Sequence, residues 1–209
     1  MPTNTFFRLP EEKRQRLIDA AWEEFSQMRF NDVSINRIIQ NAHIPRGSFY
    51  QYFVDKNDLF GYLLEEGKNY FTSVLEMILR EADGDLFAVP VRAFDWLLHR
   101  DGNPEEFLGR WIRIMRANPG IDCRRLFTDE PDQIPETARK LVDTTRLKDG
   151  SRAYVDTVFF MLISSLGVSV VETLQFPDQW KSQRDGLQQK VAIIRDGSAA
   201  PGRMQNDME

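Results

Sequence analysis

Apolar residues recur at helical spacing along most of the chain, and no stretch alternates apolar and polar residues as a half-buried strand would. The first periodic segment follows Leu9-Pro10-Glu11-Glu12. This is typical of a helix start, because proline fits the first turn and acidic side chains favour the positive end of the helix dipole. The pattern predicts an all-α protein that opens with a bracing helix.

Two short segments with one apolar side follow, at residues 34–42 and 46–53. The three residues between them include Ile44, an apolar residue that can pin the two helices together. Phe49 and Phe53 are four residues apart and point the same way on the second helix. Two short helices joined by such a turn form a helix-turn-helix, whose second helix enters the DNA major groove.

The other side of the second helix is polar. Arg46 and Lys56 place positive charge at its two ends, and Gly47 leaves room for another backbone to approach. Hydroxyl and amide groups that can bond phosphate oxygens or base edges come from Ser48, Tyr50, Gln51 and Tyr52.

The string RGSFYQYF at 46–53, followed by DKNDLF at 55–60, resembles the DNA-binding region of the TetR family of bacterial transcriptional regulators. The resemblance covers about the first 60 residues. The chain departs from the family pattern with His43 in place of the usual Gly, Pro45 in place of Ser or Thr, and Ile39 in place of Ala. Glycine suits that turn because helices often end at positive φ, which histidine tolerates better than most side chains.

The resemblance and the polar face together give a set of expected DNA contacts. Tyr50 and Tyr52 resemble the family's phosphate contacts, and Gln51 is better placed for a base edge. The resemblance also implies that the N-terminus of the helix at 34–42, at Ser34, lies against a phosphate. The full set is Ser34, Arg46, Gly47, Ser48, Tyr50, Gln51, Tyr52 and Lys56.

Six further helices are expected beyond residue 56. The first four are predicted at 57–81, 87–99, 105–117 and 135–147, with residues 118–135 mostly loop. The stretch 151–174 is apolar nearly all round, which indicates burial on more than one side. Its most apolar run, about 14 residues, is shorter than the roughly 20 that a membrane span needs.

A last helix at 178–195 has its own apolar stripe. The resemblance implies that the last two helices form a four-helix bundle with those of a second subunit. The expected interface residues are Val158, Leu162, Trp180, Leu187, Val191 and Ile194. We therefore expect a DNA-binding domain at 1–56, a helical effector-binding and dimerisation domain at 57–195, and a disordered tail at 196–209.

The resemblance also implies an effector pocket in the C-terminal helices. Its expected lining is aromatic and apolar, which suits an apolar or aromatic small molecule. The candidates are Phe71, Trp96, Trp111, Met115, Phe127 and Phe159.

Composition sets limits on the chemistry. The net charge of −5 lies outside residues 1–60, which hold eight basic and eight acidic side chains. Cys123 is the single cysteine, so neither an internal disulfide nor a cysteine-based metal cluster can form. The first residues lack the basic and apolar regions of a signal peptide, so a cytoplasmic protein is expected.

The favoured function is a dimeric, sequence-specific transcriptional repressor that responds to a small molecule and needs no cofactor. An enzyme is the first alternative, but the chain has only two histidines and neither a glycine-rich phosphate loop nor a nucleophile elbow. A helical protein-interaction module is the second, and it leaves residues 46–56 unexplained.

Overall fold

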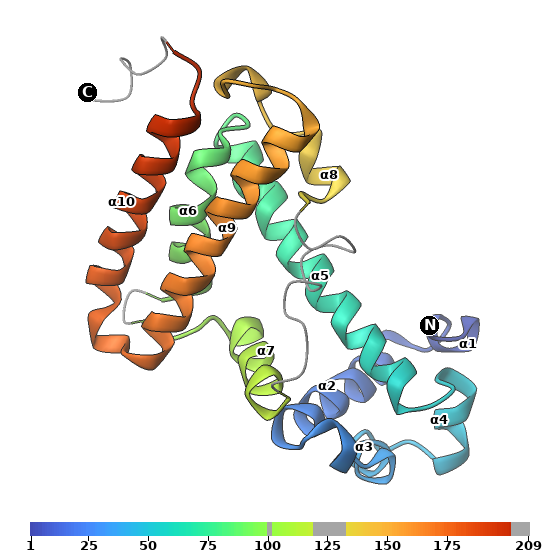
Figure 1. Ribbon diagram of the computed structural model, residues 1–209. Coiled ribbons are helices and arrows are strands. Elements are labelled where there is room, and N and C mark those ends of the chain that lie inside the picture. The colour runs from blue at the N-terminus through green and yellow to red at the C-terminus, as the bar shows by residue number, and fades with distance from the viewer. Residues whose placement is uncertain (100–101, 119–132, 202–209) are drawn as a thin grey trace. The chain divides into compact units, whose positions relative to one another are not determined.

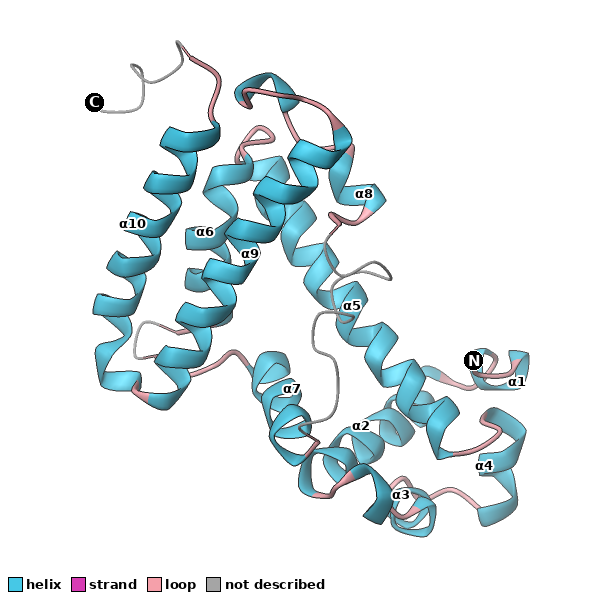
Figure 2. Cartoon of the chain, in the orientation of Figure 1, coloured by secondary structure: helices cyan, strands magenta, loops and turns pink. Residues whose placement is uncertain are grey.

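The computed structural model describes residues 1–99, 102–118 and 133–201, and the regular elements in these ranges are all helical (Figures 1 and 2). The longer helices are α2 (Glu11–Gln27), α5 (Lys56–Glu81), α6 (Val89–Leu97), α7 (Glu106–Ala117), α9 (Arg152–Gln175) and α10 (Trp180–Ser198). The shorter ones are α1 (Asn4–Phe7), α3 (Ile35–Asn41), α4 (Arg46–Tyr52), α8 (Glu136–Arg139) and the 3-10 turns η1 (Phe30–Asp32), η2 (Leu86–Ala88), η4 (Thr144–Arg146) and η5 (Pro177–Gln179). The predicted all-α class is confirmed.

Two predicted elements differ in extent, and one helix was not predicted. The helix expected at 135–147 is divided into α8 and η4, because the Asp143 carboxylate accepts a hydrogen bond from the Thr145 N–H and starts a new turn. The last helix continues to Ser198, three residues into the predicted tail, and residues 202–209 lie outside the described ranges. Helix α1 was not predicted.

The chain divides into two compact units. Unit 1 comprises Met1–Asn69 and Glu106–Leu126, and unit 2 comprises Tyr70–Glu105 and Phe127–Glu209. This division differs from the boundary predicted between residues 56 and 57, because α7 packs on α2 and so belongs to unit 1. The Trp22 and Trp111 rings of these two helices meet edge to face, with their centroids 5.6 Å apart.

In unit 2, α9 packs against both α6 and α10, and these two helices also pack against each other. Val158 and Leu162 of α9 and Leu187 and Val191 of α10 are buried within the single chain. These four residues were predicted to form a dimer interface. The structure places them in the core because α6 and α10 already cover the sides of α9 on which they lie.

Helix α9 is long and apolar enough to cross a membrane by length and composition alone. The core helix of a soluble protein passes the same test, and α9 is enclosed by its neighbours on the sides that carry Val158 and Leu162. Two of the remaining predicted interface residues, Trp180 and Ile194, are half-buried.

Candidate nucleic-acid interface

A buried carboxylate attaches the start of α3 to α2. Glu24 accepts hydrogen bonds from the Ser34 N–H at 2.8 Å and from the Arg37 Nε at 2.9 Å. The Ser34 hydroxyl in turn accepts from the Arg37 N–H, so Ser34 caps the helix as predicted. An N-cap of this kind stabilises a helix by about 1 kcal/mol. The pair of Glu24 and Arg37 fixes where α3 begins relative to α2.

The turn between α3 and α4 has the conformation that its unusual histidine suggested. His43 has a φ of 53°, in the left-handed region that glycine adopts without penalty. Ile44 is buried beneath the turn, and its N–H donates to the Ile39 carbonyl. Pro45 precedes α4 without a side-chain cap. The helix-turn-helix geometry is therefore built by residues that depart from the family pattern.

The outer face of α4 consists of Arg46, Gly47, Ser48, Tyr50 and Gln51, which are exposed or half-buried. Tyr50 has 59% of its surface exposed. A Cβ placed on Gly47 meets no atom within 4 Å, so the packing of the protein does not itself require glycine there. The inner side, formed by Phe49 and its neighbours, is buried.

Tyr52 lies in the core rather than on this outer face. Only 3% of its surface is exposed, and its ring centroid lies 6.5 Å from that of Phe6. Its predicted phosphate contact stays a prediction, and it now requires the hydroxyl to reach DNA from a buried ring. Tyr50 is the tyrosine that the outer face presents.

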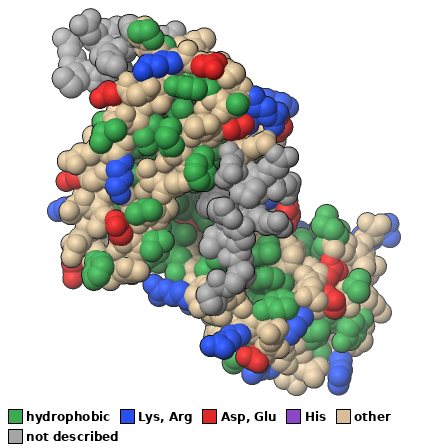
Figure 3. Space-filling view, viewed as in Figure 1, with side chains coloured by type: hydrophobic (Ala, Val, Ile, Leu, Met, Phe, Trp, Pro, Cys, Tyr) green, Lys and Arg blue, Asp and Glu red, His purple; other side chains and the backbone are tan. Residues whose placement is uncertain are grey.

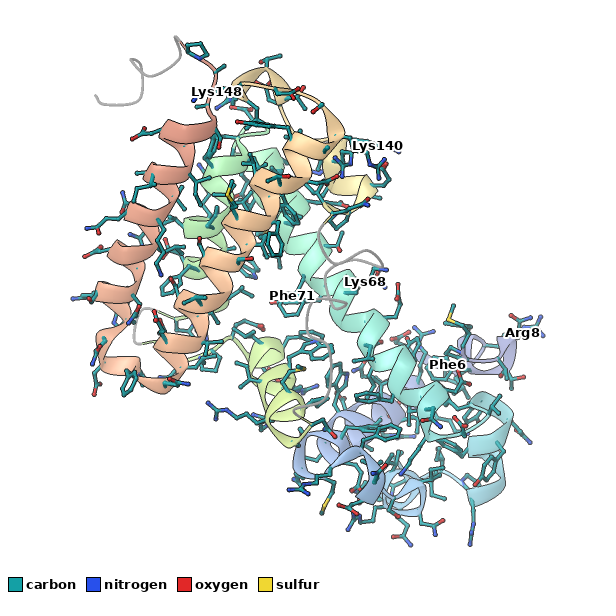
Figure 4. All side chains as sticks on the ribbon, viewed as in Figure 1. Phe6, Arg8, Lys68, Phe71, Lys140 and Lys148 are labelled. Atoms are coloured by element: carbon teal, nitrogen blue, oxygen red, sulfur yellow. The ribbon has the colours of Figure 1, made fainter. Side chains whose placement is uncertain are left out.

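An N-terminal arm, residues 1–8, closes the end of α4. The Thr3 N–H donates to the Tyr52 carbonyl at 2.9 Å, and the Thr3 hydroxyl donates to the Gln51 carbonyl at 2.6 Å. These are carbonyls that a helix end leaves without partners. Phe6 anchors the arm (Figure 4), since it is fully buried and its ring centroid lies 4.9 Å from that of Phe53. Sequence reasoning missed this role, although two adjacent phenylalanines in a supposed loop were a signal.

Lys56 has a bracing role at the start of α5. Its ammonium donates to the Phe30 carbonyl at 2.8 Å and to the Asn31 carbonyl at 2.9 Å, and it lies over the Phe30 ring. An ammonium has three N–H donors, so one remains for the predicted phosphate contact. Removing this side chain would also loosen η1.

Two aspartates fix the turn between α4 and α5. The Asp58 N–H donates to the Asp55 carboxylate, which lowers the pKa of Asp55. The Val54 N–H donates to the Asp58 carboxylate at 3.0 Å. This reciprocal cap orients the polar end of α4.

Two of the predicted effector-lining residues come together. Phe71 (Figure 4) and Phe159 line a cavity of about 40 Å³ in unit 2, with Leu75, Ala93 and other apolar side chains. Trp96 is about half exposed. Trp111 and Met115 belong to unit 1, and Phe127 lies outside the described residues.

Comparison with known proteins places these elements in a family. The family model described as bacterial regulatory proteins, tetR family, matches residues 17–63, which include α3 and α4. The HTH-type transcriptional regulator AcrR of Shigella flexneri is 38% identical over 150 residues, which cover 66% of this chain and 67% of that protein. The transcriptional regulator AcuR of Cereibacter sphaeroides is 35% identical over 72 residues, 34% of this chain and 32% of that protein.

A solved structure has the same fold. The regulatory protein TetR from Rhodobacter sphaeroides superposes with a TM-score of 0.51 at 19% identity, over 88% of this chain and 97% of that one. The chain spans less than half of the length of the first curated relatives that it matches.

Proposed function

Because the chain belongs to the TetR family of bacterial regulatory proteins, we propose that it is a transcriptional repressor that binds operator DNA through α4. Members of this family are regulators and not enzymes. The observation that carries the proposal is the outer face of α4, which is polar, carries Arg46 at the helix start and is covered by no other described element. Gln51 and Ser48 would read base edges there, and Tyr50 would bond a phosphate. The site of action would be the cytoplasm.

Gly47 offers the sharpest test of this interface. Gly47→Ala is expected to leave folding intact, or to raise the free energy of unfolding by up to about 1 kcal/mol through helix propensity. The same methyl group would stand where DNA approaches the helix backbone, so operator affinity should fall about tenfold, or 1.4 kcal/mol. Urea denaturation and fluorescence anisotropy with an operator selected from genomic fragments measure the two effects.

Gly61→Ala is the matched control. Gly61 lies in α5, and a Cβ placed on it also meets no atom within 4 Å. This variant should gain stability and bind the operator like the wild type. An unchanged operator affinity in Gly47→Ala would contradict the proposed docking of α4, and no sequence-selective complex at all would contradict the proposed function.

We further propose that two copies associate through the exposed side of α9 and α10. Apolar side chains stay uncovered along this side, and they are Phe160, Met161, Val168, Val171 and Ile193. Hydrophobic side chains reach the surface over these two helices in Figure 3. Apolar area of this kind on a soluble protein commonly marks a protein interface. A twofold dimer would present two copies of α4 to the two half-sites of an operator.

Val168→Glu is expected to give a folded monomer, because an unpaired carboxylate would have to be buried between the two copies. Val168 is 51% exposed in the single chain, so the fold itself tolerates the change. Val54→Glu is the control, since Val54 is 73% exposed and belongs to unit 1, not to α9 or α10. Sedimentation velocity at micromolar concentration measures the assembly. A dimer that persists in Val168→Glu, or a monomeric wild type, would rule out this interface.

The cavity of unit 2 is the proposed effector site. Its described lining is apolar apart from the Thr72 hydroxyl, so it would take an apolar molecule. Pockets for drug-sized ligands occupy about 300–1,000 Å³. A volume of about 40 Å³ therefore requires the helices around it to move apart when such a ligand enters, and this movement is the proposed source of regulation.

A further inference from the structure

Unit 1 contains a second and larger cleft, which the proposed function does not use. It has a volume of about 630 Å³ and is open to solvent. Its walls come from the N-terminal arm, α2, α5 and α7. Four of the lining residues are aromatic, namely Phe7, Trp22, Tyr62 and Phe107. The volume lies in the range of small-molecule sites.

Glu66 of α5 lies in the wall of this cleft with its side chain partly buried. Its carboxylate accepts a hydrogen bond from the Trp22 Nε1 at 3.4 Å, and the neighbouring Tyr62 hydroxyl favours its charged form. Within the described residues, no Lys, Arg or His forms an ion pair with Glu66. Burial raises the pKa of Glu66, because ionising a partly desolvated carboxylate is costly.

The other charges that face the cleft already have partners. On α2, Arg14 pairs with Glu11. On α7, Arg110 pairs with Asp19 at 3.0 Å and with Glu106 at 2.8 Å. The Met1 ammonium pairs with Asp58, and Glu65 lies 3.9 Å from Lys68. Among the described residues, Glu66 is therefore the carboxylate of the cleft that forms no ion pair, and it lies among aromatic rings.

We propose that this cleft binds an organic cation, with Glu66 supplying the counter-charge and the aromatic walls facing the apolar body. Aromatic faces attract ammonium groups, and a quaternary ammonium is the form that such rings bind best. A free metal ion would leave most of the volume and all four rings unused. An anion would meet Glu66 with the same sign of charge.

The site should depend on pH in a defined direction. Cation binding needs the ionised form of Glu66, and the pKa of this carboxyl lies above its usual value because of burial. Affinity should therefore fall as the pH drops through that raised pKa. The charged and titratable groups that face Glu66 are Arg14, Asp19, Tyr62, Glu65, Arg110 and the Met1 ammonium. Tyr62 does not titrate in this range, since burial and the neighbouring Glu66 charge raise its pKa to about 12.

Isothermal titration of the full chain with choline and with its uncharged isostere 3,3-dimethyl-1-butanol tests the proposal. Choline should bind at least about tenfold more tightly than the alcohol at neutral pH. Glu66→Gln should abolish this preference while keeping an oxygen to accept from Trp22. Glu65→Gln, in the exposed pair with Lys68, should retain it.

The affinities of the wild-type protein for choline and for the alcohol already test whether the cleft prefers a cation, without any variant. Equal binding of choline and the alcohol, or no binding of either, would overturn the proposal. Choline binding that Glu66→Gln leaves unchanged would place the cation elsewhere in the molecule and would also overturn it.

Discussion

Phe6→Ala is expected to lower the free energy of unfolding by about 3–5 kcal/mol, the usual cost of deleting a fully buried phenylalanine ring. The Phe6 ring packs among Tyr52, Phe53 and Tyr62, with centroids 4.9–6.5 Å away. Without it, the N-terminal arm should leave α4, and the two hydrogen bonds from Thr3 should be lost. Urea denaturation measures the cost, and trypsin cleavage after Arg8 reports the released arm.

Phe7→Ala is the control for this prediction. Phe7 is the next residue on the same short helix, but 52% of its surface is exposed. Phe7→Ala should lower the free energy of unfolding by well under half as much as Phe6→Ala. It should leave the bond after Arg8 as resistant to trypsin as in the wild type. If the two variants lose the same stability, the arm does not depend on the burial of Phe6.

Gly67→Ala is expected to destabilise the protein by about 3 kcal/mol, at the upper end of the cost of overpacking a core. A Cβ on Gly67 would stand 2.1 Å from the Trp111 ring, which is buried and cannot move aside freely. Helix propensity alone predicts the opposite sign, a gain of up to about 1 kcal/mol. Gly61→Ala on the same helix should show that gain, because its Cβ would meet open space.

A double substitution separates the contact from other effects. Trp111→Leu removes the ring that the new methyl group would strike. Gly67→Ala should therefore destabilise the Trp111→Leu variant much less than it destabilises the wild type. The difference between the two costs is the interaction energy of a double-mutant cycle. Additive costs would mean that Gly67 and Trp111 are not in contact in solution.

Helix α4 could be predicted from the sequence because its two requirements, a buried side and a polar outer side, are local. The spacing of Phe49 and Phe53 defines a buried side, and Tyr50 and Gln51 between them lie on the outer face, whereas Tyr52 is buried. The residue at the turn was predictable for the same reason, since the need for positive φ at His43 follows from where one helix stops. Neither inference requires knowing what packs against the segment from elsewhere in the chain.

The remaining features depend on partners that lie far apart in the sequence. Periodicity shows that Val158 and Leu187 lie on apolar sides of their helices, but it cannot say whether the same chain or a second copy covers them. The pairing of Glu24 with Arg37 could not be predicted from hydrophobic periodicity, because the sequence does not distinguish a buried carboxylate from an exposed one. Helix α1 has four residues, too few for a period to appear.

Unit 1 is made of two segments that are far apart in the sequence, and this affects how it folds during synthesis on the ribosome. Trp22 of α2 is covered by Phe107 and Trp111 of α7, and about 80 residues separate the end of α2 from the start of α7. At about 5–20 residues per second, translation needs on the order of ten seconds to make that stretch. During this time the part of unit 1 that is already made leaves Trp22 without its cover from α7. The unit can be completed only after α5, α6 and α7 have all left the exit tunnel.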